Sequence, residues 1–497
     1  MFKKVLIANR GEIALRIIRA CKELNIVAAV IYSEADVNAL HMLKADEAYY
    51  IGKSSAEESY LNQNKIISLA QNIGADAIHP GYGFLAENYQ FIEKVEKSGM
   101  SFIGPSSESV KLMGNKTSAR SLMKQNNIPI IPGTTSPLKS INDALKSASA
   151  IGYPIMLKAS SGGGGKGIRI VNSETELPEL FNLVKSESQK AFGNNDIYIE
   201  KYLIDPKHIE VQILADNFGN YRHLYERECS IQRRHQKIIE EAPSPSINMD
   251  DRNKITNIAI NAAKVCKYHN AGTIELLMDK NKEFYFLEMN TRVQVEHPVT
   301  EFITNIDIVK EQIKIASGEE ISFEQDEIRI LGHSIECRIY AEDSSNNFSP
   351  STGKITNYIH PSGIGVRVDS GIDLNSEVSI YYDPLLSKIV TFGKDRNEAL
   401  KRMFISLKNY LITGISTNIN FCKWIVQHQI FIDNKFNINF IDRELSNYLE
   451  SKNNSTELTD EYIVSVLVSS LLFNESRITK STKSNVNQQN NWTCDFE

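Results

Sequence analysis

Short apolar runs alternate with segments of helical periodicity through the first ~110 residues. The apolar runs have the length of strands, and the segments between them repeat apolar residues three or four positions apart. The predicted strands are Lys4–Ala8, Val27–Tyr32 and Ala75–His79, and the predicted helices are Glu12–Leu24, Lys65–Asn72 and Phe91–Ser98. This alternation predicts a parallel sheet with helices on its faces. No GxGxxG follows the first strand, which argues against a nicotinamide-dependent enzyme.

The pattern changes at about Ile128. A linker containing proline and glycine covers 129–137, and Pro154–Val171 then predicts a strand, a glycine loop and a second strand, in a compact unit that ends near Leu203. From there to about Glu450 many segments alternate with a period of two. That alternation predicts an antiparallel sheet with flanking helices.

A polar tail is predicted beyond Glu450, where Ser, Asn, Thr and Gln dominate. One apolar stretch, Tyr462–Phe473, is predicted to be a helix. The last ~20 residues have the composition of disordered segments.

Composition and charge narrow the class of protein. The 497 residues, 41% hydrophobic and 23% charged, are enough for two to four globular domains. A net charge of -6 argues against general nucleic-acid binding. The six cysteines form no CxxC motif, and no apolar run approaches a signal peptide or the ~18–20 residues of a membrane span. These features predict a cytoplasmic protein with reduced thiols.

The first candidate site is a glycine loop. Lys158 is followed by Ala-Ser-Ser, four consecutive glycines (162–165), Lys166 and Gly167. Consecutive glycine N–H groups can point at one anion, and the flanking lysines add positive charge, so the segment predicts a phosphate cradle. It lacks the GK[ST] of a Walker loop. The alternative is a flexible hairpin tip.

The second candidate site is a hairpin formed by Thr273–Asp279 and Glu283–Asn290. If it turns on Asn281-Lys282, Glu275 lies opposite Glu288, with Asn290 on the same face. Opposed carboxylates destabilise a sheet unless a positive charge lies between them, and Mg²⁺ is a natural occupant. The alternative is a solvated polar face.

The same alternation continues beyond Asn290 and predicts a longer strand. Arg292, Gln294 and Glu296 share its polar face, and His297-Pro298 ends the run. Arg292 and Gln294 could hold an oxyanion, and Glu296 is then positioned to take a proton from it.

Two further segments are ambiguous alone. Glu226–Lys237 could be a nucleic-acid patch, a solvated basic loop, or a set of donors for ribose, phosphate or bicarbonate, and Ser334–Tyr340 is an alternating strand with Arg338 on its polar face. Together, a nucleotide-binding glycine hairpin, two metal-binding acids and a base predict phosphoryl transfer to a carboxylate-like acceptor.

Seven segments in series resemble the biotin carboxylases of the ATP-grasp superfamily. They are KVLIANRGEIALRIIRA at the start, HPGYGFLAEN at 79–88, IGP and MGNK at 103–116, KASSGGGGKG, RECSIQRRHQK, FLEMNTRVQVEHPVTE and IECRIYAED. They run in family order over about 1–445. The resemblance implies a ligase that carboxylates biotin with ATP and bicarbonate by way of carboxyphosphate.

The resemblance also implies the nucleotide and metal contacts. The phosphate contacts are Lys116, Lys158, Gly163, Gly164 and Gly165. The adenine, ribose and remaining ATP contacts are Glu200, Lys201, Leu203, Ile438, His208, Gln232, His235, Glu275, Leu277 and Glu288. The ligands of Mg²⁺ or Mn²⁺ are Glu275, Glu288 and Asn290.

The remaining implied roles concern bicarbonate and biotin. Bicarbonate is held by Lys237, Arg292, Gln294 and Val295, and Glu296 deprotonates it. Arg338 stabilises the biotin enolate, and Tyr82 shapes the biotin pocket. The catalytic set is therefore Glu296, Arg292, Arg338 and Lys237.

The implied fold combines α/β and α+β parts. A doubly wound N-terminal domain (1–115) precedes an ATP-grasp domain (116–330) with a mobile lid at about 129–203. A C-terminal domain (331–446) and a variable tail (447–497) follow. Lid closure would exclude water from the unstable carboxyphosphate.

The expected partners follow from what the sequence lacks. It contains no Met-Lys-Met biotin-attachment motif and no carboxyltransferase-sized segment. We therefore expect a homodimer that acts on a separate biotin carboxyl carrier protein or biotinylated subunit, with a carboxyltransferase component. The acceptor of the whole complex could be acetyl-CoA, propionyl-CoA or pyruvate; a length near 500 leans toward the biotin-carboxylating subunit of a two-subunit pyruvate carboxylase.

Two other classes of function stay open. One is an ATP-grasp ligase with a different acceptor, such as an amino acid or a purine-precursor amine. The other is a catalytically silent nucleotide-binding subunit, which would have no need for Lys237, Arg292, Glu296 and Arg338 together. Bicarbonate-dependent ATP hydrolysis that rises with free biotin distinguishes a biotin carboxylase from both.

Overall fold

The computed structural model describes residues 1–134, 136–159, 168–192, 195–455 and 467–473. The chain divides into two compact units, Met1–Asp442 and Arg443–Glu497. In the second unit, 467–473 is helical, which agrees with part of the helix predicted at Tyr462–Phe473; 462–466 lie outside the described residues.

The N-terminal region contains a parallel five-stranded sheet with the order β3-β2-β1-β4-β5. The strands are β1 (Lys4–Ile7), β2 (Val27–Ser33), β3 (Glu47–Gly52), β4 (Ala77–His79) and β5 (Ser101–Phe102). The helices are α1 (Gly11–Glu23), α2 (Leu40–Lys44), α3 (Gln63–Asn72), α4 (Tyr89–Lys97), η1 (Glu34–Asp36) and η2 (Ala56–Glu58). The predicted doubly wound domain is confirmed, whereas β3 was not predicted because Glu47–Gly52 lacks a continuous apolar run.

The apolar stripe of α1 explains how this domain begins. Ile13, Ile17, Ala20 and Cys21 are 0–2% exposed, as their helical spacing predicts. They pack in one core with the buried side chains of β1 and β2. Burial of this stripe, rather than helix propensity, stabilises the helix.

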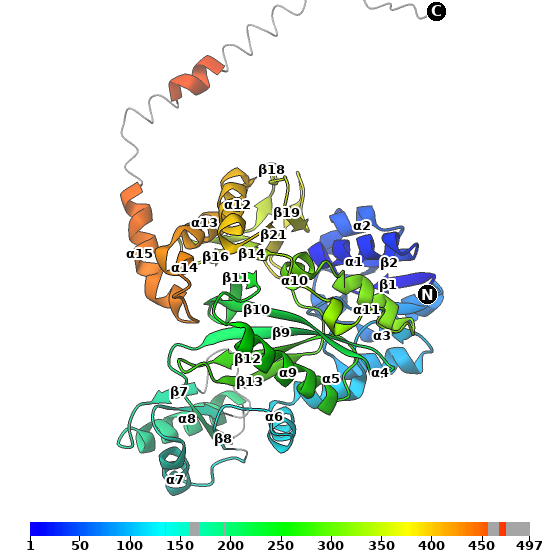
Figure 1. The fold of residues 1–497 in the computed structure, drawn as a ribbon. Helices are drawn as coiled ribbons and strands as arrows, with labels where there is room; N and C mark the ends of the chain where they lie inside the picture. Colours follow the sequence, from blue (N-terminus) through cyan, green and yellow to red (C-terminus); the bar gives the residue numbers. More distant parts are fainter. Residues whose placement is uncertain (135, 160–167, 193–194, 456–466, 474–497) are drawn as a thin grey trace, which may run out of the picture. The chain divides into compact units, whose positions relative to one another are not determined.

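A smaller antiparallel sheet follows the linker and has the order β7-β6-β8. Its strands are β6 (Ile155–Ala159), β7 (Ile168–Val171) and β8 (Ile197–Lys201). The helices of this region are α5 (Ser107–Gly114), α6 (Lys116–Gln125), α7 (Ile141–Ile151) and α8 (Leu177–Phe192). Figure 1 shows α7 and α8 beside this sheet, and they share its core. The two strands predicted around the glycine loop are thus confirmed.

The largest sheet is antiparallel throughout, with the order β13-β12-β9-β10-β11-β14-β21-β19. Its strands are β9 (Lys207–Ala215), β10 (Tyr221–Arg233), β11 (Gln236–Ala242), β12 (Asn270–Met278), β13 (Phe284–Asn290), β14 (His333–Tyr340), β19 (Val366–Ser370) and β21 (Leu385–Gly393). This sheet confirms the period-two prediction. The sheet combines strands from before residue 330 (β9 to β13) with strands from after it (β14, β19 and β21). Side chains from both parts of the chain can therefore share one face of the sheet.

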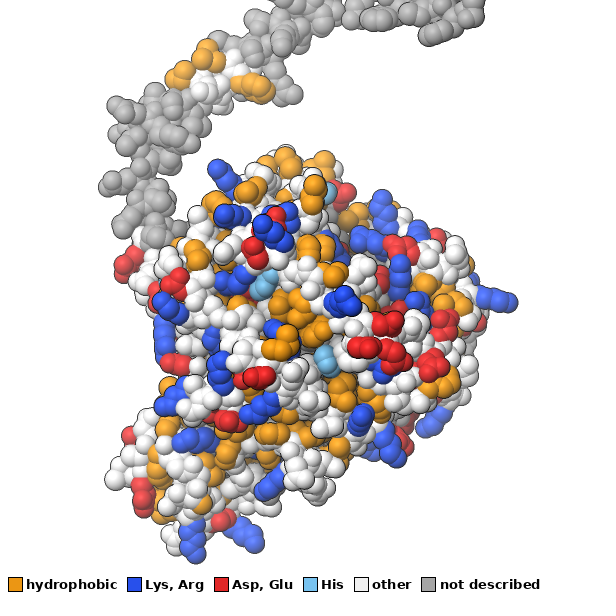
Figure 2. Space-filling model, in the orientation of Figure 1, with side chains coloured by type: hydrophobic (Ala, Val, Ile, Leu, Met, Phe, Trp, Pro, Cys, Tyr) orange, Lys and Arg blue, Asp and Glu red, His pale blue; other side chains and the backbone are white. Residues whose placement is uncertain are grey.

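Helices and short strands complete the fold. The helices are α9 (Met249–Val265), α10 (His297–Thr304), α11 (Ile308–Ala316), η3 (Gln325–Glu327), α12 (Arg396–Asn409), α13 (Ile419–Gln427), α14 (Gln429–Ile432) and α15 (Phe440–Ser455). The short strands are β15 (Glu342–Asp343), β16 (Ser349–Pro350), β17 (Gly353–Lys354), β18 (Asn357–Ile359), β20 (Glu377–Val378) and β22 (Leu411–Thr413). No described helix has both the length and the apolar character needed to cross a membrane. Figure 2 shows acidic and basic side chains interspersed on the face in view.

Candidate active site

The hairpin of β12 and β13 brings two acidic residues opposite each other. Glu275 is the Cα partner of Glu288, as predicted. The turn itself differs from the prediction: Asp279 and Glu283 close a loop in which Lys282 has a φ of 61°, a three-residue form rather than a two-residue one. A bulge at Leu287 offsets the difference, because the register shifts by one residue between Glu275 and Leu276.

The predicted strand beyond Asn290 is wrong. β13 ends at Asn290, and Glu296 instead occupies the N-cap of α10, whose first turn contains Pro298. The backbone N–H of Thr291 donates to Glu87 Oε1 at 3.1 Å rather than to a neighbouring strand. Proline is favoured in the first turn of a helix, which explains why the chain turns into α10 there.

Lys237 lies at the centre of the buried acids. Its Nζ lies 2.6 Å from Glu210 Oε2, 2.9 Å from Glu275 Oε1 and 2.8 Å from Glu296 Oε1. Burial disfavours the ammonium, but Glu210, Glu275 and Glu296 outweigh it and raise the pKa of Lys237 well above its usual value. Acids from two strands and one helix N-cap therefore surround a single cation on a third strand.

Arg227 is a second buried cation that sequence reasoning missed. Its guanidinium is fully buried and donates to the side chains of Glu210, Gln212, Thr300, Thr273 and Gln294. The signal was present in β9, where His208, Glu210 and Gln212 alternate with apolar residues. A strand with such a polar face inside a protein needs buried partners.

The segment around Arg227 is therefore not a solvated loop. β10 and β11 form a hairpin that turns at Arg234 and His235, and Cys229, Ser230 and Ile231 are buried.

Glu296 lies between two cations. Its Oε1 contacts Lys237, and its Oε2 lies 2.9 Å from Arg338 Nη2. Burial opposes ionisation, but Lys237, Arg338 and Arg227 outweigh it and hold the pKa of Glu296 well below its usual value. The side chain is therefore a carboxylate near neutral pH.

Arg338 connects Glu296 to another acid. Its Nε lies 2.5 Å from Glu240 Oε1. Burial raises the pKa of Glu240 to about 7, although Arg338 opposes this and nearby Glu296 adds to it.

The segment between β13 and α10 carries the other predicted anion-binding residues. Arg292 Nε donates to Glu87 Oε2 at 2.9 Å, and its Nη2 donates to Asn290 Oδ1 at 3.0 Å. Gln294 Nε2 donates to Glu275 Oε1 at 3.0 Å. The main-chain oxygen of Val295 accepts from Lys388 Nζ at 2.7 Å. Arg292, Gln294, Lys237 and Glu296 thus join one network of charges and hydrogen bonds.

A cavity of about 440 Å³ opens beside this network. Its lining includes Arg292, Val295 and Arg338 together with Tyr82 and Glu12 of the N-terminal region. The Tyr82 hydroxyl donates to Glu12 Oε1. The structure therefore brings the two predicted biotin contacts, Tyr82 and Arg338, to one cavity.

The predicted nucleotide contacts fall into two groups. In the first, Lys158 forms an ion pair with Glu200, as does Arg120, which was not predicted, and Lys201 Nζ donates to the carbonyls of Gly152 and Tyr153. These pairs join β6, α6 and β8.

The second group lies on the largest sheet. His208 Nδ1 and Gln232 Nε2 are 2.7 Å apart, and His208 Nε2 lies 3.0 Å from Glu275 Oε2. Leu277 is the Cα partner of His208. His235 is exposed at the hairpin tip, outside these contacts. The Ile438 main chain donates to Pro206, just before β9, and Leu203 is half-buried.

Part of the predicted phosphate site falls outside the described residues. Gly163, Gly164 and Gly165 lie there, as does Lys166. For Lys116 only the backbone is described, at the start of α6.

The predicted metal ligands fit a hard divalent cation by their chemistry. Glu275, Glu288 and Asn290 offer carboxylate and amide oxygens, the donors that Mg²⁺ prefers. Asn290 Nδ2 donates to Glu275 Oε1 at 2.7 Å, so its side chain already faces that carboxylate.

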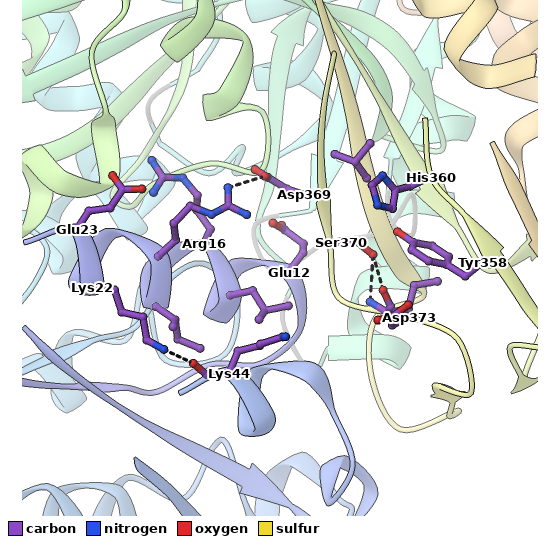
Figure 3. Close-up of a pocket in the computed structure, with 15 residues that line it drawn as sticks. Glu12, Arg16, Lys22, Glu23, Lys44, Tyr358, His360, Asp369, Ser370 and Asp373 are labelled. Atoms are coloured by element: carbon purple, nitrogen blue, oxygen red, sulfur yellow. Dashed lines mark hydrogen bonds and ion pairs between the residues drawn. The ribbon is translucent and has the colours of Figure 1, made fainter. Parts of the chain in front are cut away.

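A second cavity, of about 470 Å³, lies between α1 and β19 (Figure 3). Arg16, Arg19 and Asp369 contribute to its lining. Glu12 lines both cavities. Arg292, Val295, Arg338 and Tyr82 line the first cavity and are absent from the lining of the second, so only the first brings predicted site residues together.

Three known families match the chain in order. "Biotin carboxylase, N-terminal domain" matches residues 1–110, "Carbamoyl-phosphate synthase L chain, ATP binding domain" matches 115–324, and "Biotin carboxylase C-terminal domain" matches 336–443.

Individual proteins match most of the chain. "Biotin carboxylase 1" of Bacillus subtilis is 49% identical over 443 residues, which cover 89% of this chain and 98% of that one. A pyruvate carboxylase subunit of Methanothermobacter thermautotrophicus is 51% identical over 442 residues, 89% of this chain and 90% of that one.

A solved structure agrees with these relatives. It is the biotin carboxylase domain dimer of 2-oxoglutarate carboxylase from Hydrogenobacter thermophilus, in complex with MgADP, ADP and bicarbonate. Its TM-score is 0.83 at 47% identity, with coverage of 89% of this chain and 98% of that one. At this identity and coverage, the chain belongs to the biotin carboxylase family.

Proposed function

We propose that this protein carboxylates biotin on a separate carrier protein, with ATP and bicarbonate, as the first half-reaction of a biotin-dependent carboxylase. The observation that carries the proposal is the buried carboxylate of Glu296, held between Lys237 and Arg338, directly behind Val295 and Arg338 of the cavity lining. A buried base flanked by two cations suits an anionic substrate that must lose a proton.

The first step forms carboxyphosphate. Lys237, Arg292, Gln294 and the Val295 main chain bind bicarbonate, and Glu296 accepts its proton. The bicarbonate oxygen then attacks the γ-phosphorus of ATP, and ADP leaves with the electrons of the broken phosphoanhydride bond. Positioning and charge neutralisation supply most of the catalysis in such a transfer.

The second step moves the carboxyl group to biotin. Carboxyphosphate releases CO2 and phosphate, and the phosphate takes the ureido N–H proton of biotin. Arg338 stabilises the biotin enolate formed in this way. The deprotonated ureido nitrogen of biotin then attacks CO2 to give carboxybiotin. The cavity supports this assignment because it is lined by both Tyr82 and Arg338.

The nucleotide is held by both sheets. Lys158 and Lys116 bind its phosphates together with Gly163–Gly165, and Glu200, Lys201, Leu203 and Ile438 surround the adenine. His208, Gln232 and His235 bind the ribose and phosphates. A divalent cation bound by Glu275, Glu288 and Asn290 would neutralise phosphate charge. Lys237 and His208 contact Glu275, so they keep its carboxylate ionised and ready for that ligand role.

The partners follow from the half-reaction. A biotinylated carrier delivers biotin and a carboxyltransferase consumes carboxybiotin, and the enzyme itself forms a homodimer. The Hydrogenobacter relative is described as a dimer, which supports the last point. The cytoplasmic location remains a prediction from the sequence.

The test measures ADP release by the purified protein with MgATP, with and without bicarbonate, and then with added free biotin. We expect hydrolysis that depends on bicarbonate and rises with biotin, and ¹⁴C-bicarbonate incorporated into carboxybiotin. Hydrolysis that is indifferent to bicarbonate, or that rises with an amine acceptor instead, would reject the proposal.

A further inference from the structure

One buried cation behind the lining of the first cavity has no role in the proposed function. Lys388 lies on β21 and is fully buried. It is the Cα partner of Arg338 on one side and of Asp369 on the other. Burying an ammonium is costly unless its charge is paired and its donors are used. Its contacts therefore show which groups it holds in place.

The ammonium of Lys388 connects two elements that border the cavity. Its Nζ donates to the main-chain oxygen of Val295 at 2.7 Å, and Val295 immediately precedes Glu296. The same Nζ lies 3.3 Å from Glu12 Oε2. The other oxygen of Glu12 accepts the hydrogen bond of Tyr82.

These contacts form one polar chain, Tyr82–Glu12–Lys388–Val295. Glu12 belongs to α1, Val295 to the segment before α10, and Lys388 to the largest sheet. Figure 3 shows Glu12 on α1 facing the strand that carries Asp369. Tyr82, Glu12 and Val295 line the cavity, and Lys388 connects Glu12 to Val295 from behind that lining. The chain thus joins a proposed biotin contact, Tyr82, to a proposed bicarbonate contact, Val295.

We propose that Lys388 is a positioning residue that fixes the Val295–Glu296 backbone and, through Glu12, the Tyr82 ring, so that carboxyl transfer occurs over a constant distance. The inference rests on the proposed function and adds to it a residue that touches no substrate. Such positioning matters because a displacement of the reacting groups by about 1 Å can slow catalysis substantially.

The test compares three variants in the full-length protein. Lys388→Met removes the ammonium but keeps an unbranched side chain. Glu12→Gln breaks the ion pair while leaving the Lys388–Val295 hydrogen bond. Arg252→Met is the matched control, because it removes a buried cation paired with Glu226, and neither residue lines the cavity.

Each variant is assayed for bicarbonate-dependent ATP hydrolysis and for free-biotin carboxylation. For Lys388→Met we expect the KM for bicarbonate to rise at least tenfold, the KM for ATP to stay within about twofold, and carboxybiotin formed per ATP to fall. For Glu12→Gln we expect the KM for biotin to rise at least threefold with that for bicarbonate unchanged. Arg252→Met should lower only the melting temperature.

The outcomes separate this inference from the proposed function. Absence of bicarbonate-dependent hydrolysis in the wild-type protein would reject the function itself. Wild-type kinetics in Lys388→Met, or equal changes in the ATP and bicarbonate constants, would reject the positioning role. If Lys388→Met does not fold, Glu12→Gln decides, and an unchanged KM for biotin in that variant would overturn the inference.

Discussion

The Glu296 carboxylate lies 2.8 Å from the Lys237 ammonium, in a buried site that both residues share with Glu210 and Glu275. This contact keeps Glu296 ionised before the substrate arrives, but a strongly stabilised carboxylate is a weak base. Bicarbonate bound to Lys237 and Arg292 would compete with Glu296 for the positive charge of these two cations. The pKa of Glu296 would then rise as the substrate binds, when a proton must be taken.

Replacing the base should stop the reaction before carboxyphosphate forms. We expect Glu296→Ala to lower bicarbonate-dependent ATP hydrolysis by at least about 100-fold, the scale of general-base catalysis. Nucleotide affinity, measured by calorimetry, should change little because Glu296 does not bind ATP. Near-normal turnover in this variant would assign proton removal to another group.

The phosphate-binding role of Lys158 predicts a change in nucleotide affinity. We expect Lys158→Gln to raise the Kd for ATP about tenfold or more, because a charge-assisted contact to phosphate is lost. Lys185→Gln, at an exposed position of α8, is the control. Equal affinities for the two variants, by fluorescence titration, would contradict the role.

Loss of Arg338 should impair biotin carboxylation much more than the formation of carboxyphosphate. We expect Arg338→Ser to retain slow bicarbonate-dependent ATP hydrolysis but to lose biotin carboxylation by at least about 100-fold. The two rates are measured separately, by ADP release and by ¹⁴C incorporation. Parallel loss of both would mean that Arg338 acts mainly by holding Glu296.

The metal ligands predict a dependence on free Mg²⁺. We expect Glu288→Gln to raise the Mg²⁺ concentration for half-maximal activity about tenfold or more, since even outer-sphere partners change metal affinity by about 10–100-fold. Glu283→Gln, an exposed acid of the same hairpin, should not change it. A Mg²⁺ requirement that is the same in both variants would exclude Glu288 as a ligand.

A buried ion pair away from the cavity predicts how stability depends on pH. Burial opposes the ionisation of Glu241, but Arg396 and His333 outweigh it and lower its pKa from 4.5 to about 2. A carboxyl whose folded pKa is depressed stabilises the fold above its unfolded pKa, and this contribution, about 3 kcal/mol at most, is lost as the pH falls from about 4.5 to 2.

Arg396→Leu tests that dependence. The variant should have a lower free energy of unfolding than the wild type above pH ~5. This gap in free energy should narrow as the pH approaches 2, because protonation of Glu241 removes the ion pair from the wild type as well. Urea unfolding across this range measures it. Arg402→Leu, in the same helix, is the control because it leaves the Glu241–Arg396 pair intact. Any difference in unfolding free energy between this variant and the wild type should not narrow between pH ~5 and 2.

Local patterns predicted the parts of the fold that depend on local periodicity. The stripe of α1 and the pairing of Glu275 with Glu288 follow from the spacing of apolar and polar residues. β3 was missed because Glu47–Gly52 is mixed in character. The end of β13 was missed because alternation continues through a segment whose backbone bonds to Glu87 instead of a strand.

The buried cations show what local patterns cannot reveal. Arg227 and Lys388 have partners that lie far away in the chain: Thr300 and Glu12, respectively. A lone arginine or lysine in a strand looks the same whether it faces solvent or a buried carboxylate. Only the order of strands in the largest sheet decides between them, and that order is set by long-range pairing.

The bulge at Leu287 absorbs one residue of β13 without changing either face of the hairpin. Side chains along a regular strand point alternately to opposite faces, so Phe286 and Glu288 would share a face if Leu287 were an ordinary strand residue. Instead, Phe286 pairs with Leu276 in the core, and Glu288 pairs with Glu275 on the other face. Protein engineers could therefore delete Leu287 and keep both pairings, because the deletion would only convert the bulge into a regular ladder.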